Sequence, residues 1–181
     1  MVDKNKFYLE KINSIVFLGY SSLFDEFIKF NSKLNINSKI ITSTDQSKFI
    51  KNEFIVFDLL EEEFMKYVKD NFKIKNTLFI SFGSRNIFKK NIIKELNNNL
   101  VNFHCSRLPL DKGGGGFSWR ILREDRIDNQ LVHLIDNGID TGPVIDYKQS
   151  LFPKECKIPL DFELYSKINL VKFYQEFIIK I

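Results

Sequence analysis

Residues 100–109 read LVNFHCSRLP and residues 137–145 read NGIDTGPVI, and the arrangement of the whole chain follows from these two segments. The first segment has an apolar lead that ends in Asn102 and His104. If residues 100–104 form a strand, the two side chains project from the same face, because they are two positions apart. An amide and an imidazole would then stand side by side at the end of a buried strand.

The second segment adds Asp140, in a loop that also contains Gly138 and Gly142. The amide of Asn102 can stabilise an oxyanion, the imidazole of His104 can move protons, and the carboxylate of Asp140 can orient that imidazole. Acyl transfer to an amine uses groups of these kinds. We therefore predict that Asn102, His104 and Asp140 are catalytic.

Each of these residues also has an ordinary structural interpretation. Asn102 could be a satisfied surface or capping residue, and a lone histidine such as His104 is more often structural than catalytic. Asp140 could serve the turn alone, because aspartate accepts backbone N–H bonds and glycine permits positive φ. The occurrence of all three residues in this order favours the catalytic interpretation.

The two segments resemble the motif of the folate-dependent formyltransferases, in which Asn-x-His-x-Ser-x-Leu-Pro is followed by a Gly-x-Asp-x-Gly loop. The matching residues are Asn102, His104, Ser106, Leu108, Pro109, Gly138, Asp140 and Gly142. Arg107 departs from the leucine that is commoner in the family, and the glycine run 113–116 is longer. This variant most resembles the branch that formylates nucleotide-linked amino sugars. The resemblance also implies a cis bond between Leu108 and Pro109.

This resemblance implies an N-formyltransferase that uses 10-formyltetrahydrofolate as cosubstrate and needs no metal. The implied acceptor is the amine of a dTDP- or UDP-linked 4,6-dideoxy amino sugar, of the kind found in lipopolysaccharide O-antigen or another glycan. Glycinamide ribonucleotide formyltransferase is the alternative with the same chemistry. A folate hydrolase and a catalytically inactive folate- or nucleotide-binding protein also stay open. The formyl-tRNA branch is disfavoured by the absence of its extra domain and by the weak basic charge.

Alternating apolar strands and amphipathic helices predict an α/β fold, with a Rossmann-like, mostly parallel sheet and helices on both faces. Strands are expected at residues 15–18, 38–42, 54–57, 76–80, 100–104, 129–136 and 143–150. Helices are expected at residues 23–33, 61–72, 89–97 and 161–181, with a further helix starting at residue 117. Ser21 or Ser22 is expected to cap the first helix, and Pro153 and Pro159 mark a linker. One catalytic domain is expected over residues 1–181, and the resemblance covers residues 14–150.

Ligands bind beyond the carboxyl ends of the strands in open α/β sheets, so the loops there are expected to bind folate and acceptor. The folate-binding residues that the resemblance implies are Phe82, Asn86, Ile87, Phe88, Asp136 and Gly138. Ile87 and Phe88 could equally be core residues. The acceptor-binding residues are expected to be Tyr20, Ser21, Arg85, Lys112, Gly113 and Trp119.

Four of these acceptor-binding residues have specific reasons behind them. Ser21 lies at a strand-turn-helix junction, where free N–H groups can bind phosphate. Arg85 and Lys112 could each meet phosphate or only solvent. Trp119 could stack on a nucleotide base, although packing in the core is the stronger expectation. The chain has no Gly-x-Gly-x-x-Gly motif, so a dinucleotide cofactor is not supported.

The remaining chemistry-bearing residues are expected to be structural. Cys105 and Cys156 make neither a disulfide framework nor a metal spacing, and Cys105 should point away from the face that carries His104. His133 has no motif around it and is interpreted as structural. No metal site is predicted.

Charge and composition limit the partners. The 181 residues carry a net charge of +4, which suits anionic small molecules and is too weak to indicate nucleic-acid binding. Residues 1–11 lack the apolar core of a signal peptide, and no apolar run is long enough to span a membrane, so a cytoplasmic protein is expected. The last helix has more apolar residues than one packed face needs, which suggests a homodimer.

Overall fold

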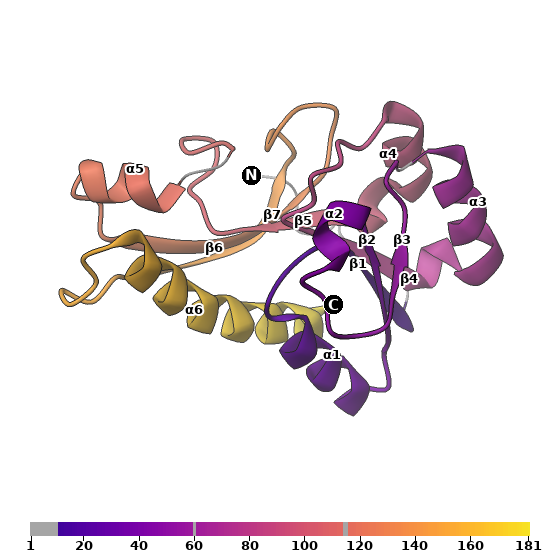
Figure 1. Cartoon of the computed structure of the whole chain (residues 1–181), viewed down its shortest axis with the longest axis horizontal. Helices are drawn as coiled ribbons and strands as arrows, with labels where there is room; N and C mark the ends of the chain where they lie inside the picture. The colour runs from indigo at the N-terminus through magenta and orange to yellow at the C-terminus, as the bar shows by residue number, and fades with distance from the viewer. Residues whose placement is uncertain (1–10, 60, 114–115) are drawn as a thin grey trace.

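The computed structural model describes residues 11–59, 61–113 and 116–181. Within these residues, seven strands form one sheet in the order β3-β2-β1-β4-β5-β6-β7 (Figure 1). The strands are β1 (Ser14–Gly19), β2 (Asn37–Thr42), β3 (Phe54–Val56), β4 (Thr77–Phe82), β5 (Leu100–His104), β6 (Ile127–Leu134) and β7 (Val144–Leu151). The first five strands pair in parallel, whereas β6 runs antiparallel to both β5 and β7.

Helices cover both faces of the sheet. They are α1 (Phe24–Lys33), α2 (Thr44–Ser47), α3 (Glu62–Asn71), α4 (Lys90–Leu96), α5 (Gly116–Leu122) and α6 (Pro159–Lys180), with short 3-10 turns η2 (Ile74–Asn76) and η3 (Asn97–Asn99). Figure 1 shows α1 and α6 side by side along one face, and α3 and α4 together on the other. The predicted α/β fold, with a mostly parallel sheet between two helical layers, is confirmed.

The central strand β1 shows how the sequence produces these layers. Ile15, Val16, Phe17 and Leu18 are all buried, because the strand is covered on both faces. Ile15 and Phe17 pack into the core on the α1 and α6 side, and Val16 and Leu18 pack into the core against α3 and α4. Alternate residues of the strand therefore serve two separate cores.

Two expectations about helix ends are wrong. Neither Ser21 nor Ser22 caps α1, because Leu23 takes the N-cap position and no side chain bonds to the first turn. Instead, Ser21 Oγ accepts a hydrogen bond from the Leu23 N–H at 3.2 Å, before the helix begins. Pro159 does not belong to a linker but starts α6, since the fixed φ of proline suits the first helical position.

Other expectations concern the ends of the chain. Residues 1–10, which are expected to lack a signal peptide, lie outside the described residues. No helix in the described part of the chain is long and apolar enough to cross a membrane. Helix α6 leaves Leu160, Leu164 and Ile168 exposed, one turn apart, while Phe162 and Leu170 are buried. The homodimer stays a prediction.

Candidate active site

The three predicted catalytic residues lie at one cavity of about 410 Å³. Asn102 and His104 project from one face of β5 at its carboxyl end, and both side chains are half-buried. Asp140 reaches the same cavity from the loop between β6 and β7, which pair as the expected hairpin. Gly113 also lines the cavity, whereas residues 114 and 115 of the glycine run lie outside the described residues. Residues that are far apart in the sequence therefore meet at one end of the sheet.

The Asp140 carboxylate is the centre of this arrangement. Its Oδ2 lies 3.3 Å from His104 Nε2 and accepts a hydrogen bond of 2.9 Å from the Gly113 N–H. Its Oδ1 lies 3.6 Å from His133 Nε2. Proximity of the His104 ring, helped by the Gly113 N–H, lowers the pKa of Asp140 to about 2 against the cost of burial. Asp140 is therefore an anion at neutral pH.

The Nε2 atom of His104 is close to Asp140 but is not aligned for a hydrogen bond with it. This nitrogen is buried and has no aligned hydrogen-bond partner among the described residues. A buried polar atom in this state is uncommon, and a catalytic role is one explanation for it. The imidazole and the carboxylate together can hold or move a proton at the cavity wall.

His133 also lies in this cluster, although no motif surrounds it in the sequence, and its structural role stays a prediction. It faces Asn102 across the β5–β6 pair, and Asn102 Nδ2 lies 3.1 Å from His133 Nε2. His133 Nδ1 lies 2.8 Å from the Leu134 carbonyl, which can only accept, so Nδ1 carries the proton. Burial lowers the pKa of His133, which favours this neutral ring with Nε2 as acceptor. The missed signal is the pairing register, which a single sequence does not contain.

Most of the predicted folate-binding residues line the same cavity. Asn86, Ile87 and Phe88 come from the loop after β4, and Asp136 and Gly138 come from the loop after β6. The side chain of Ile87 is 78% exposed, so it is free to contact a ligand rather than part of the core.

Phe82 is the exception among them. Strand β4 extends to this residue, and its ring is buried against Phe27 and Phe103 with centroid separations of 5.2 Å to each. The side chain therefore lies in the core on the α1 and α6 side and does not line the cavity.

Arg85 lines the cavity as well, but its guanidinium is engaged. Arg85 Nη1 forms an ion pair with Asp45 Oδ2. Next to it, Gln46 Nε2 donates a hydrogen bond of 2.9 Å to the Gly83 carbonyl. The helix α2 thus holds the loop after β4 from outside, and Arg85 could reach a phosphate only by sharing Asp45.

The other predicted acceptor-binding residues lie at two smaller cavities. Tyr20 and Ser21 line one of about 200 Å³ at the end of β1. Lys112, Gly113 and Trp119 line one of about 250 Å³ together with Arg123, and Gly113 also borders the main cavity.

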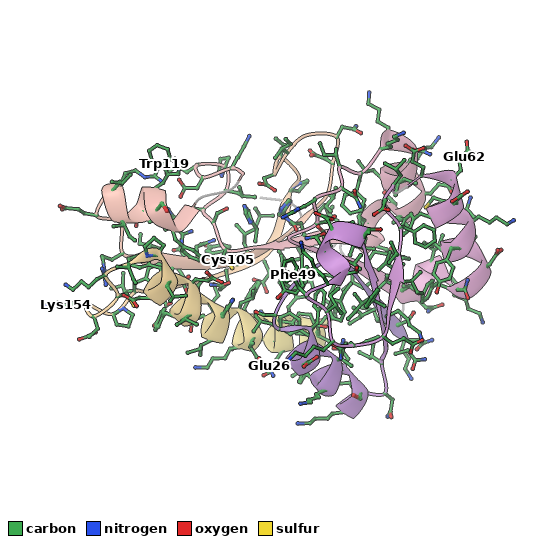
Figure 2. The ribbon with its side chains drawn as sticks, in the orientation of Figure 1. Glu26, Phe49, Glu62, Cys105, Trp119 and Lys154 are labelled. Carbon is green, nitrogen blue, oxygen red and sulfur yellow. The ribbon has the colours of Figure 1, made fainter. Side chains whose placement is uncertain are left out.

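The stronger expectation for Trp119, that it packs in the core, is wrong. Its side chain is 60% exposed and points away from α5 toward solvent (Figure 2). The buried position on this short helix is taken instead by Arg120.

Cys105 takes no part in the cluster. Its thiol lies 3.1 Å from Gln130 Oε1, to which it donates, and burial raises the pKa of Cys105 to about 11. Among the described residues, no three His, Cys, Asp or Glu side chains are grouped so that they could hold a metal ion. The predicted cis bond between Leu108 and Pro109 is confirmed.

Comparison with known proteins identifies related sequences. No protein-family model matches the chain. Over 98 residues it is 30% identical to the methionyl-tRNA formyltransferase of Thermodesulfovibrio yellowstonii, a match that covers 50% of this chain and 30% of that protein. It is 24% identical over 120 residues to the same enzyme of Finegoldia magna, covering 66% of this chain and 34% of that protein. The chain therefore matches about a third of the length of these curated relatives.

Solved structures match over nearly the whole chain. Phosphoribosylglycinamide formyltransferase from Bacillus halodurans superposes with a TM-score of 0.70 at 17% identity, covering 90% of this chain and 91% of that one. The formyltransferase PseJ from Anoxybacillus kamchatkensis gives 0.66 at 19% identity, covering 91% and 74%. The sugar 3N-formyltransferase WlaRD gives 0.64 at 20% identity, covering 94% and 62%. The chain has the formyltransferase fold, and its resemblance to the folate-dependent formyltransferases is confirmed.

Proposed function

We propose that this protein transfers a formyl group from 10-formyltetrahydrofolate to a primary amine. The observation that carries the proposal is the meeting of Asn102, His104 and Asp140 at one cavity, at the carboxyl end of the strands. An amide donor, an imidazole and an anionic carboxylate beside it are the groups that such a transfer needs. The fold and the sequence relatives support the same class of reaction.

In the proposed reaction, the amine nitrogen attacks the formyl carbon and the carbonyl oxygen becomes an oxyanion. Asn102 Nδ2 and a protonated His104 donate hydrogen bonds to that oxygen, and Asp140 stabilises the imidazolium. Collapse of the intermediate breaks the bond to N10 of the folate, which takes up a proton as the amine loses one. Because a carboxylate with a pKa of about 2 is a weak base, we assign Asp140 mainly to holding His104 charged and oriented, and the amine proton passes through water.

We further propose that the amine belongs to a nucleotide-linked 4,6-dideoxy sugar. Two structural neighbours support this acceptor: PseJ was solved with UDP-4,6-dideoxy-4-formamido-L-AltNAc and tetrahydrofolate, and WlaRD with dTDP and 5-N-formyl-THF. The exposed Trp119 could stack on a base, with Lys112 beside it as a cation for a diphosphate, whereas Arg123 is already paired with Asp111. Tyr20, Ser21 and Arg85 stay predicted acceptor contacts, and the cytoplasmic location stays a prediction.

The second candidate acceptor is glycinamide ribonucleotide. The Bacillus halodurans enzyme favours it, because that chain is covered over 91% of its length, whereas the two sugar-modifying neighbours are covered over 74% and 62%. The chemistry at His104 would be the same for both acceptors, so only the acceptor contacts differ.

Turnover with defined amines tests these proposals. The protein is incubated with 10-formyltetrahydrofolate and either a dTDP- or UDP-linked 4-amino-4,6-dideoxy sugar, glycinamide ribonucleotide, or buffer alone. Release of tetrahydrofolate is followed by absorbance and the formylated product by mass spectrometry. We expect a formamido sugar nucleotide. Formylation of glycinamide ribonucleotide alone would reverse the ranking of acceptors, and release of formate in every mixture would indicate a hydrolase.

A further inference from the structure

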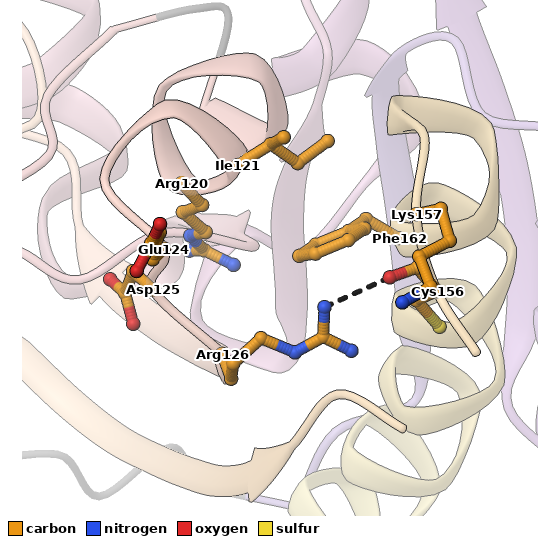
Figure 3. Close-up of a pocket in the computed structure, with 8 residues that line it drawn as sticks. All are labelled: Arg120, Ile121, Glu124, Asp125, Arg126, Cys156, Lys157 and Phe162. Atoms are coloured by element: carbon orange, nitrogen blue, oxygen red, sulfur yellow. Dashed lines mark hydrogen bonds between the residues drawn. The ribbon is translucent and has the colours of Figure 1, made fainter. Parts of the chain in front are cut away.

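A further cavity, of about 290 Å³, lies away from the catalytic one. It opens where the end of α5 and the start of β6 face the segment that leads into α6 (Figure 3). The two cavities have no lining residue in common. The groups that surround this space are therefore independent of the proposed transfer.

Arg120 is the unusual group at this cavity. Its side chain is fully buried, and Figure 3 shows its guanidinium pointing toward the enclosed space. Nη2 donates a hydrogen bond of 2.7 Å to the Cys105 carbonyl, but Nε and Nη1 have no partner among the described residues. Phe117 and Phe152 lie over the guanidinium at 5.7 and 6.0 Å. A buried cation with unsatisfied N–H groups is costly, so an acceptor is missing here.

The neighbouring carboxylates do not supply that acceptor. Asp128 attracts Arg120 through space, but its Oδ1 accepts from Ser166 and Gln130 and its Oδ2 accepts from Asn169. Asp125 forms an ion pair with Arg107. Among the described residues, no carboxylate is within ion-pair distance of the Arg120 guanidinium.

Arg126 is the second arginine that lines this cavity. Among the described residues, its guanidinium donates hydrogen bonds only to backbone carbonyls. Nη1 donates to the Cys156 carbonyl at 2.9 Å (Figure 3). Nη2 donates to the carbonyls of Phe152 and Pro153. Backbone carbonyls carry no net charge, so the positive charge of Arg126 is not neutralised by them. Lys157, whose side chain is exposed, adds another positive charge at the rim.

We propose that this cavity binds a small organic carboxylate. Three cationic and two anionic side chains line it, which leaves one positive charge in excess, so a monoanion fits better than a phosphate dianion. The carboxylate would accept a hydrogen bond from Nε or from Nη1 of Arg120, which lie on opposite edges of the guanidinium and both lack a described partner. Ile121 and Phe162 give the same space an apolar side, which suits a carboxylate with an apolar group. A volume near the lower limit of ligand sites excludes a folate or a nucleotide sugar.

Benzoate is a suitable probe, because it joins one carboxylate to one apolar ring. The full chain is titrated with benzoate, inorganic phosphate or chloride at matched ionic strength, and binding is followed by saturation-transfer NMR and by the unfolding temperature. We expect a saturable response to benzoate only. A response to phosphate alone, or no saturable response, would overturn the proposal.

Three variants locate the response. Arg120→Met removes the buried guanidinium and should abolish benzoate binding. Because that variant could fail to fold, Lys157→Gln changes only an exposed rim residue and should weaken binding several-fold. Lys154→Gln is the matched control, an exposed lysine of the same segment that does not line the cavity. Benzoate binding that survives unchanged in Lys157→Gln and in a folded Arg120→Met would place the ligand elsewhere and contradict the proposal.

Discussion

Asn102 and His133 are direct partners across the antiparallel β5–β6 pair, with Asn102 Nδ2 3.1 Å from His133 Nε2. His133 is fixed in turn by its own Nδ1, which donates to the Leu134 carbonyl at 2.8 Å. One N–H of the amide therefore points at the histidine, and the other is left for the cavity. A neutral His133 is a condition for this orientation, because a protonated ring has no acceptor to offer.

The state of His133 makes stability depend on pH. Burial lowers the pKa of His133 below its ordinary value of 6.5, so below that pH the unfolded chain binds more protons than the folded protein. The contribution of this ring to stability is fully present above pH 6.5 and is lost as the pH falls toward the folded-state pKa. We expect the free energy of unfolding to fall more between about pH 7.5 and 5.5 in the wild type than in His133→Gln. Urea unfolding at both pH values measures this, and equal decreases would contradict it.

Substitution of the catalytic residues should separate turnover from binding. His104→Asn and Asp140→Asn should lower kcat by roughly 10²–10⁴-fold, because both groups act on protons and charge that develop during attack. Asn102→Ala should cost about 10²–10³-fold, as loss of an oxyanion donor does. The losses should not add, since the residues act as one unit. Steady-state kinetics and calorimetric folate binding measure both effects, and weakened binding with unchanged kcat would assign these residues to ligand affinity instead.

Cys105→Ser should retain most of the activity. The thiol is buried with a pKa of about 11, so it is protonated at neutral pH and unsuited to attack a formyl group. Serine keeps a donor for Gln130, whose Oε1 lies 3.1 Å from the sulfur. Kinetics on Cys105→Ser beside His104→Asn, with folding checked by circular dichroism, make the comparison. Loss of turnover in the first variant and retention in the second would require a covalent thiol route.

Gly142→Ala should disturb the loop that carries Asp140. A Cβ at Gly142 would lie 1.8 Å from the Leu134 carbonyl oxygen, which is backbone of β6 and cannot move aside. We expect unfolding to require about 1–3 kcal/mol less, with a fall in kcat as Asp140 shifts. Gly116→Ala is the control, because nothing lies within 4 Å of a Cβ there and its stability should be unchanged or slightly raised. Similar stability of the two variants in chemical denaturation would refute this account.

The features of the fold and site that depend on local periodicity could be predicted from the sequence. The two-residue spacing of Asn102 and His104 fixes their common face once residues 100–104 form a strand, as they do in β5. The layered sheet was predictable for the same reason, since its buried strands are short apolar runs separated by amphipathic helices. These features need no knowledge of which strands are neighbours.

What could not be predicted depends on tertiary pairing. His133 enters the site only because the β5–β6 register puts it opposite Asn102. Trp119 is exposed and Arg120 is buried, which is the reverse of what their residue types suggest. Arg120 can be buried because the Cys105 carbonyl accepts a hydrogen bond from its guanidinium and two phenylalanine rings pack against it. Phe82 was predicted to contact folate, but it does not line the cavity. Strand β4 continues to that residue and directs its ring into the core.

The division of the sheet into a parallel and an antiparallel part has a consequence for protein engineering. Asn102, His104, His133 and Asp140 all come from the β5–β6–β7 side, and their positions follow from hydrogen-bonded pairing between those strands. The opposite wall, residues 83–88, follows the parallel strand β4 and is held by α2 through Gln46. A combinatorial library at residues 86–88 would thus vary the shape offered to ligands while the proton-handling residues keep their scaffold. New substrate preferences could be selected on this chain without rebuilding its chemistry.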